Sequence, residues 1–470
     1  MTMKIRHDLT PTALRPKLER FWRLSAQKIL ALEKASLPGG GAPVFTVRGR
    51  YTARGWTEWT QGFQFGAALL QFDVTGEKEF LELGQRQTVA RMAPHLTHFG
   101  VHDHGFNNVS TYGNLWRLMN AGRIRDNEWE RNFYELALKV SGAVQARRWT
   151  ALPEGGYIHS FNGPHSLFAD TIRSLRSLAL AHKLGHALCE ENDRRISLLE
   201  RLIQHAQTTV KYNVYFGKGR DAYDVRGRVA HESIFNLTDD CYRCPNSQQG
   251  YSPFTTWTRG LAWILLGCAE QLEFVATLTD AELKPFGGRH VAVDLFLRPA
   301  LATADYYIEQ TASDGIPYWD NGAPGLAQLG DYLNRAAEPF NDHEPVDSSA
   351  AAIAAQGLLR LGSFVSRQTS KKAYTKHETR DAGRRYWDAG LTVLNTLLDE
   401  PYLSTSAQHQ GLILHSVYHR PNGWDYVPRG RKVPCGESSM WGDYHIREAA
   451  LLVQRFAADA PYYTFFGDQP

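Results

Sequence analysis

The sequence predicts an all-α protein of the (α/α)6 toroid class, in which six inner helices are surrounded by six outer helices. Two observations lead to this prediction: apolar residues recur at helical spacing along twelve successive segments, and strand-like alternation is scarce. No low-complexity linker divides the chain, so we expect a single domain over residues 1–470, with the first helix forming part of the barrel. The predicted helices cover residues 11–35, 60–73, 77–95, 104–121, 127–147, 166–185, 192–214, 255–277, 290–311, 347–363, 379–399 and 439–457.

The even-numbered segments carry the chemically unusual motifs. These are GWTEWTQGF before the second segment, VHDHGF before the fourth, FNGPHSLFAD at the sixth, SQQGYSPFTTWTRGLAW at the eighth, EPVDSSAAAIAA at the tenth and SSMWGDYHIREAA at the twelfth. If the even segments form the inner ring, all six motifs meet at one mouth of the barrel and form a pocket. Small residues at 66–68 and 350–352 suit a crowded inner ring, and the absence of a recurring repeat argues against a solenoid.

Composition and charge exclude several classes. Lysine and arginine total 52 against 49 acidic residues, and this net charge of +3 is too balanced for a surface that binds nucleic acid or membranes. The start, MTMKIRHDLTPTALRPKLERFW, has no apolar core of a signal peptide, and no run of about 18 apolar residues predicts a membrane span. We therefore expect a cytoplasmic protein. Nothing in the sequence predicts its oligomeric state.

The five cysteines predict neither a disulfide framework nor a metal site. Their number is odd and their spacing irregular. Cys241 and Cys244 form a CxxC pair, but a zinc site would need two further ligands and no second pair follows. We expect neither a metal nor another cofactor.

Asp170 lies in the stretch GPHSLFADTIRSLRSLALAHKLG, one turn into the helix predicted at 166–185. It could simply pair with Arg173 or interact with the helix N-terminus. Because the stretch opens an even-numbered segment, we predict instead that Asp170 faces the pocket. Asp103, in VHDHGF, opens another even segment and could cap its helix or join Asp170. Two acids in one pocket repel when ionised, and burial raises the pKa of one, which suits acid–base catalysis on a sugar.

Other motif residues are candidates for contacts with a substrate. Arg259 could bind a carboxylate through two parallel hydrogen bonds, which suits a sugar acid better than a neutral sugar. It precedes Trp263 by four residues, so its guanidinium could stack on that indole. Aromatic residues, 12% of the chain, suit a sugar cleft, although they could equally fill a large core. The predicted substrate contacts are His102, His231, Gln249, Arg259, Trp263, Trp59 and Trp257.

Alternative function classes lack their motifs. A Ser/His/Asp hydrolase of the nucleophile-elbow type needs GxSxG, and a dinucleotide enzyme needs GxGxxG between a strand and a helix; neither is found. A non-catalytic sugar-binding protein stays open, because stacking aromatics alone would serve it. Such a protein would not need two acids in its pocket.

The motifs resemble those of glycoside hydrolase family 88, the unsaturated glucuronyl hydrolases. HDHGF resembles the family's HDxGF, QGYSPFTTWTRGLAW resembles its QGYxxxSxWxRGxAW, and PYWD, EPVDSSAAAIAAQGLL and WGDYHIREAA follow in the family's order. The resemblance covers roughly residues 55–457. It implies an (α/α)6 barrel that acts on oligosaccharides left by polysaccharide lyases, with Asp170 as catalytic acid and base and Asp103 as the second aspartate. The family's histidine, glutamine, arginine and tryptophan contacts fall on His231, Gln249, Arg259 and Trp263.

The chemistry that this resemblance implies is hydration of an unsaturated uronic acid at the non-reducing end. Protonated Asp170 gives its proton to C4 of the C4–C5 double bond, and the resulting carboxylate deprotonates a water that adds at C5. The hemiketal then opens and expels the aglycone. Asp103 holds ring hydroxyls and helps to bring the pKa of Asp170 near neutral.

Departures from the family pattern concern the sugar and the linkage. The family's catalytic aspartate stands in a DNxxN context, whereas Asp170 is followed by Thr-Ile-Arg-Ser, and Ser247-Gln248 stands where a histidine is common. Extra sequence lies around 215–246 and 364–380. An unsaturated galacturonyl hydrolase and an enzyme that cleaves saturated β-glucuronides stay open as alternatives.

Overall fold

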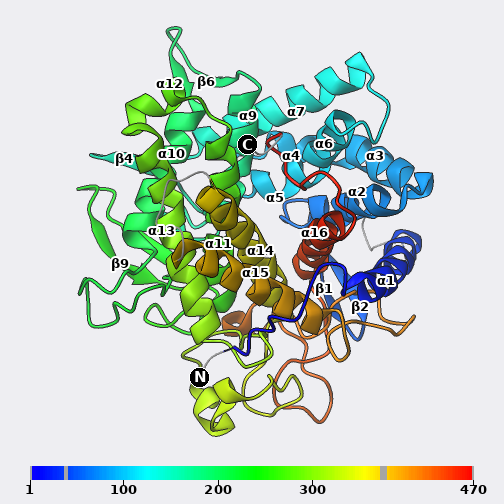
Figure 1. Ribbon diagram of the computed structural model, residues 1–470. Coiled ribbons are helices and arrows are strands. Elements are labelled where there is room, and N and C mark those ends of the chain that lie inside the picture. Colours follow the sequence, from blue (N-terminus) through cyan, green and yellow to red (C-terminus); the bar gives the residue numbers. More distant parts are fainter. Residues whose placement is uncertain (1–2, 36–40, 371–377, 468–470) are drawn as a thin grey trace.

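The computed structural model is mostly helical and describes residues 3–35, 41–370 and 378–467 (Figure 1). Six helical segments, which we call the central segments, pack one against the next, and the last packs against the first. In chain order they are α2 (Gln61–Thr75); α5 (His104–Asn108) with the π-helical turn η2 (Val109–Gly113) and α6 (Asn114–Asn120); α8 (Thr171–Ser174) with α9 (Arg176–Lys183); α11 (Thr258–Ala276); α14 (Ser348–Ser370); and α16 (Met440–Ala457).

Six further long helices pack on the outside of the central segments. α1 contacts α2 and α16, α3 contacts α2, α7 contacts α5 and α9, α10 contacts α8 and α9, α13 contacts α11 and α14, and α15 contacts α14 and α16. Their bounds are α1 (Arg15–Lys34), α3 (Lys78–Arg91), α7 (Glu128–Arg147), α10 (Leu198–Tyr212), α13 (Gly288–Glu309) and α15 (Glu378–Leu397). The central and outer helices alternate along the chain, as the predicted even and odd segments do. Two short helices, α4 (Ala93–Leu96) and α12 (Asp280–Leu283), lie in the connections.

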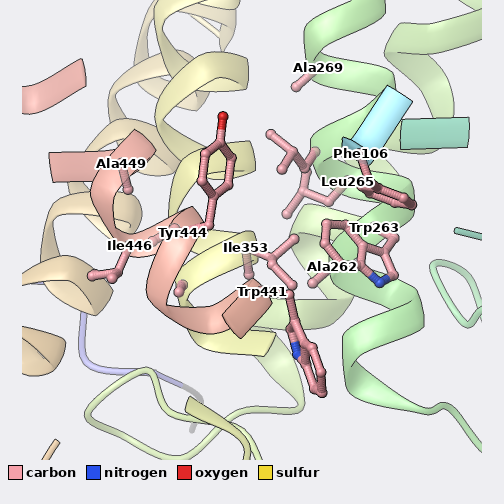
Figure 2. Packing of buried hydrophobic residues seen from close by; sticks show 14 of the residues in the cluster. Phe106, Ala262, Trp263, Leu265, Ala269, Ile353, Trp441, Tyr444, Ile446 and Ala449 are labelled. Carbon is pink, nitrogen blue, oxygen red and sulfur yellow. The ribbon is translucent and has the colours of Figure 1, made fainter. Parts of the chain in front are cut away.

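Burial distinguishes the two groups of helices. Every residue of α11 from Thr258 to Val275 is buried, because other helices surround it. Outer helices bury one face only: in α10 the buried apolar residues include Leu198, Leu202 and Ala206, at helical spacing. Figure 2 shows side chains of α11, α14 and α16 packing together in the middle of the molecule.

Charged side chains also meet inside this core. Arg173 binds both Glu270 and Glu448, the latter at 2.9 Å, and Arg176 Nη1 lies 3.5 Å from Glu448. All four side chains are at most 1% exposed. Tyr444 adds a hydrogen bond of 2.9 Å to Glu448. Each buried ion thus lies beside an ion of opposite charge, which offsets part of the cost of removing it from water.

Nine short strands occur in the described part of the chain, where the sequence predicted very little strand. They form small antiparallel sheets in the connections, of which the largest has the order β5-β8-β9. Runs of three to six residues are too short to produce a clear alternation of apolar and polar side chains. The strands are β1 (Ala42–Val47), β2 (Arg50–Arg54), β3 (Trp149–Leu152), β4 (Gly155–Ile158), β5 (Ser166–Phe168), β6 (Ala187–Cys189), β7 (Arg195–Ser197), β8 (Glu232–Phe235) and β9 (Tyr242–Asn246).

The helix predicted at 166–185 is wrong in its first turn. Residues Ser166–Phe168 form β5, which pairs with β8, and Asp170 lies just before α8 rather than one turn inside a helix. The apolar spacing was compatible with either structure, and the pairing with a distant strand decided between them. Arg173 binds Glu270 and Glu448, so the simple local pair between Asp170 and Arg173 does not form.

Three other predicted boundaries also shift. The helix predicted at 77–95 divides into α3 and α4, with Pro94 in the first turn of the second helix. The helix predicted from residue 192 begins at Leu198, where Ser197 accepts a hydrogen bond from the Glu200 backbone N–H. The tenth predicted helix extends to Ser370, while residues 371–377 of the extra sequence lie outside the described residues. No helix within the described ranges is long and apolar enough to cross a membrane.

Candidate active site

The N-terminal ends of the central segments lie together, and this brings the predicted motifs into contact. The longer helices α11, α14 and α16 direct the positive ends of their dipoles towards this place, which favours negative charge there. Contacts between neighbouring segments are His102–Asp170 (3.5 Å), Phe168–His231 and His231–Trp257 (ring centroids 4.5 and 4.7 Å), Arg259–Asp347 (3.2 Å), Trp441–Ser349 (2.9 Å), Trp59–Trp441 (5.1 Å) and Trp59–Phe106 (5.4 Å).

Asp103 and Asp170 form an acid pair with His102 between them. His102 Nε2 lies 3.6 Å from Asp103 Oδ1 and 3.5 Å from Asp170 Oδ1. The imidazole is 1% exposed, whereas the two carboxylates keep 10% and 12% of their side-chain surface exposed. Among the described residues, Asp170 Oδ1 has no hydrogen-bond partner of ordinary geometry. The pair is therefore shielded from bulk water yet still able to reach a bound molecule.

The pKa values of Asp103 and Asp170 shift in opposite directions. Burial raises the pKa of Asp103, and the negative charge of Asp170 adds to this rise. Burial alone would raise the pKa of Asp170, but its interaction with His102, with a smaller contribution from the neighbouring His231, outweighs burial and lowers this pKa. The two aspartates in turn raise the pKa of His102 despite its burial. The expectation that burial near Asp103 brings the pKa of Asp170 near neutral is thus not met, because the interaction with His102 favours the carboxylate form of Asp170.

His231 is held in one protonation state. Its Nδ1 accepts hydrogen bonds from the backbone N–H groups of Gln248 (3.1 Å) and Gln249 (3.3 Å), so the proton of the neutral ring resides on Nε2. Burial lowers the pKa of His231 to about 4, which keeps the ring neutral. Within the described chain, Nε2 has no hydrogen-bond partner. His231 therefore presents a fixed N–H donor beside the acid pair.

Arg259 is 1% exposed and binds protein groups on both terminal nitrogens. Nη1 donates to Asp347 (3.2 Å) and to the Val417 carbonyl, and Nη2 donates to the Tyr418 carbonyl (2.8 Å) and to Gln249 Oε1 (2.9 Å). Arg259 thus joins two motifs and the 417–418 loop. Arg259 also fixes the Gln249 amide, whose NH₂ group can then donate a hydrogen bond to a bound molecule. Arg259 itself therefore contributes to anion binding only indirectly.

The tryptophans occupy different depths. Trp263 is 1% exposed and packs against His445 and Phe106, in the core position shown in Figure 2. The predicted stacking of Arg259 on Trp263 is wrong: the guanidinium lies over Trp257 and Trp441, at 4.6 and 4.9 Å from their ring centroids. Trp263 lies one turn further along α11, where its ring meets the core instead.

Known proteins with similar sequences and structures include unsaturated glucuronyl hydrolases. A scan against known protein families finds no match. The chain is 25% identical over 411 residues to the unsaturated glucuronyl hydrolase of Bacillus sp. (strain GL1), covering 86% of this chain and 89% of that protein. It is 24% identical over 394 residues to the unsaturated glucuronyl hydrolase of Formosa agariphila, covering 83% and 79%. The crystal structure of the Bacillus sp. GL1 protein matches with a TM-score of 0.67 and 22% identity over 93% of this chain and 97% of that chain.

The chain is thus similar in sequence to unsaturated glucuronyl hydrolases along most of its length. This confirms the resemblance to glycoside hydrolase family 88 that the motifs indicated. The structural match establishes a fold shared with the Bacillus sp. GL1 protein along nearly the whole length of both chains.

Three residues of the site were missed by the sequence analysis. Glu58, between Trp56 and Trp59, lies near Asp103, and burial with the charge of Asp103 raises the pKa of Glu58 to about 7. Phe161 is half exposed and stacks on His102 at a centroid distance of 5.9 Å. Asp347 anchors Arg259. All three lie in or beside quoted motifs, but only the tertiary structure shows which side chains of a motif turn towards the acids.

Among the residues that the structure describes, no group of three or more histidine, cysteine, aspartate or glutamate side chains lies close enough to hold a metal. Cys241, just before β9, and Cys244, within β9, are exposed free thiols.

Proposed function

We propose that this chain is a glycoside hydrolase that removes a 4,5-unsaturated uronic acid from the non-reducing end of oligosaccharides produced by polysaccharide lyases. The relatives named unsaturated glucuronyl hydrolase support this substrate class. We further propose that residues 1–470 form one (α/α)6 catalytic domain. The mutual packing of the six central segments, each covered by outer helices, supports that architecture.

The observation that carries the proposal is the acid pair around His102. Asp103 favours its protonated form and Asp170 its ionised form, with one imidazole nitrogen within 3.6 Å of both. Carboxyl groups in different environments are how a site holds an acid and a base at the same pH. A protein that only bound sugars would not need two acids in its pocket.

His102 supplies the proton that Asp170 needs. When an anionic uronate binds and excludes water, the charged pair of His102 and Asp170 loses stabilisation, and the proton moves from Nε2 to the carboxylate. Neutral His102 and protonated Asp170 result, with no net change in charge. Asp170 then protonates C4 of the substrate, which leaves positive charge shared between C5 and the ring oxygen.

Addition of water completes the reaction. Asp170, again a carboxylate, takes a proton from a water molecule as the water oxygen bonds to C5. The hemiketal at C5 opens to a ketone, and C1 releases the aglycone. Asp103 binds ring hydroxyls and adjusts the protonation of its neighbours.

Recognition of the uronate rests on neutral donors in a positive environment. The Nε2–H of His231 and the amide NH₂ of Gln249 are the directed donors, and Arg259 and the ends of the long central helices supply the favourable field. Trp59, which is partly exposed and stacked on Trp441, offers an aromatic surface to the sugar ring.

A panel of lyase-generated disaccharides of the chondroitin, heparin, hyaluronan, xanthan, pectin and ulvan types tests the proposal. Turnover removes the conjugated double bond, so absorbance in the ultraviolet falls. We expect turnover of at least one glucuronate-derived disaccharide. Turnover of the pectin type alone would assign an unsaturated galacturonyl hydrolase instead. Cleavage of saturated glucuronides alone would assign a β-glucuronidase, and binding without turnover would assign a sugar-acid-binding protein.

A further inference from the structure

We propose that Glu232 is a positioning residue that fastens two loops, one that contacts His102 and one that contacts His231; the proposal rests on the function proposed above. Glu232 lies in β8 next to His231 and is 1% exposed. Its carboxylate accepts hydrogen bonds from Ser166 Oγ, from Asn162 Nδ2 (3.1 Å) and from Asn246 Nδ2 (2.6 Å). Three donors from two parts of the chain, residues 162–166 and Asn246, thus meet on one buried carboxylate.

The first loop covers His102. Asn162 follows Phe161, whose ring stacks on His102 at 5.9 Å with an interplanar angle of 19°. Phe161 is 50% exposed, so contact with the core alone does not fix its position. The Asn162–Glu232 hydrogen bond holds this loop against the β5-β8-β9 sheet. Glu232 thereby sets how well Phe161 shields the imidazole and both aspartates from water.

The second loop holds His231 and Gln249. Asn246 ends β9, and the next three residues bring the Gln248 and Gln249 backbone N–H groups to His231 Nδ1. Glu232 therefore fixes the start of the segment that determines the tautomer of His231. The same segment carries the Gln249 side chain that Arg259 orients.

A carboxylate suits this task because all of its partners are donors. Its two oxygens accept from Ser166, Asn162 and Asn246 at once, whereas a glutamine has one accepting oxygen and one donating NH₂ group. A glutamine at this position can keep the Ser166 and Asn162 bonds and can bind Asn246 after that amide rotates. Asn162 and Asn246 are exposed, so loss of Glu232 leaves their amides able to bind water. The loops would then loosen without unfolding the core.

The test compares Glu232→Ala and Glu232→Gln with a matched control, Asp305→Ala. Asp305 also accepts hydrogen bonds from three side chains, Arg226, Arg385 and Tyr386, but it lies on the outer helix α13. We expect Glu232→Ala to lower kcat/KM about 30- to 100-fold, the size of effect that a misplaced catalytic group produces. Glu232→Gln should lose only about 3- to 10-fold, the value of one weakened hydrogen bond, and Asp305→Ala should retain wild-type kcat/KM.

The pH profile separates positioning from stability. Loosening of Phe161 admits water to His102 and to the acid pair, and the change in their burial shifts the alkaline limb of kcat/KM in Glu232→Ala only. The variants leave in place all the titratable groups that face Asp103 and His102, which are Asp170, Glu58, Arg148, His159, His205 and His231. Glu232→Ala with wild-type kcat/KM and an unshifted limb, whatever its melting temperature, would overturn the proposal.

Amide hydrogen exchange gives a reading that does not depend on turnover. Exchange should accelerate at residues 160–166 and 246–250 in Glu232→Ala, and not in Asp305→Ala. If the wild type turns over none of the uronides, the proposed function fails while exchange still decides whether Glu232 fastens the loops. Unchanged exchange in both segments would overturn the proposal even where the wild-type enzyme is active.

Discussion

The central segments hold two groups of buried carboxylates with different partners: arginines bind one group, and a histidine lies beside the other. Glu448, further along α16, is bound by Arg173, Arg176 and Tyr444 and is fully buried. Burial would raise its pKa, but the two arginines hold the pKa of Glu448 well below its ordinary value. Asp170, at the start of α8, has only His102 within ion-pair distance among the described residues, and one of its oxygens lacks a hydrogen bond of ordinary geometry.

The two groups of carboxylates therefore have different roles within one set of helices. A carboxylate with two arginines cannot take up a proton near neutral pH and serves to hold helices together. A carboxylate beside one histidine can exchange a proton with it when the surroundings change. Glu448 is thus a permanently charged acid in the middle of a helix, whereas Asp170 is an exchangeable acid at the N-terminal end of one.

The largest expected effect is on turnover. Asp170→Asn should lower kcat about 10³- to 10⁴-fold, because the amide can neither give a proton to C4 nor take one from water. Its melting temperature should stay close to that of the wild type, since Asp170 has no arginine partner to lose. Steady-state kinetics on a reactive disaccharide and thermal unfolding measure the two quantities. A variant that kept most of its activity would refute the catalytic role of Asp170.

The corresponding substitution in the arginine-bound group, Glu448→Gln, should lower stability rather than turnover. Glu448→Gln leaves the Arg173 and Arg176 charges less compensated, at a cost of about 3–5 kcal/mol in the free energy of unfolding. Denaturant unfolding measures this loss. The kcat of the folded fraction, corrected by active-site titration, should remain within about threefold of the wild type. A specific loss of kcat without destabilisation would erase the distinction between the two groups.

Glu58 should make stability depend on pH. Its pKa is raised from 4.5 to about 7, so between these values the folded state binds more protons than the unfolded state, and the free energy of unfolding falls as pH rises. One unit corresponds to about 1.4 kcal/mol, which sets an upper bound of about 3 kcal/mol for this group. Glu58→Gln should flatten the dependence between about pH 4.5 and 7 in denaturant titrations. An unchanged slope would show that other groups cause it.

Arg259 should affect binding more than chemistry. In Arg259→Lys a single ammonium cannot serve Asp347, the 417–418 carbonyls and Gln249 together, so the Gln249 donor loosens. KM for an unsaturated uronide should rise about tenfold, with a smaller change in kcat. Any neutral glycoside that is cleaved provides the comparison. An equal rise in KM for neutral and acidic sugars would count against uronate recognition and in favour of a neutral-sugar hydrolase or an epimerase.

Removal of metal ions should have the smallest effect. The acid pair and its histidine need no metal for the proposed chemistry, and Cys241 and Cys244 are exposed thiols. Dialysis against a chelator should leave kcat/KM unchanged. Activity that is lost on chelation and restored by zinc or calcium would reassign the role of these residues.

Motif spacing was enough to predict the alternation of central and outer helices and the meeting of Asp103, Asp170 and Arg259. Each of these three residues stands at or near the start of an even-numbered segment, and local sequence determines that position. His231 lies just before β8, and only the family resemblance indicated its place in the site. The short strands were not predictable, because β5 forms only when β8, over sixty residues later, lies beside it. The lowered pKa of Asp170 was not predictable from the sequence either, since it depends on where the His102 ring lies.

The role of Arg259 shows the same limit. Its charge and its neighbours predicted a residue of the site, which is where it lies. Its hydrogen bonds to the 417–418 loop connect residues far apart in the sequence, and no local pattern signals them. Side-chain direction, rather than position along the chain, was what the sequence could not provide.

Isotope labelling tests most directly whether Asp170 drives hydration of a double bond rather than ordinary glycoside hydrolysis. In heavy water, transfer of a solvent-derived proton by one fixed carboxyl group should place deuterium at C4 of the product on a single face. Water containing heavy oxygen should label C5, read by mass fragmentation before the ketone exchanges its oxygen. In a standard retaining or inverting hydrolase, the water oxygen ends at C1 and C4 is not touched. Oxygen label at C1 with no deuterium at C4 would contradict the proposed mechanism.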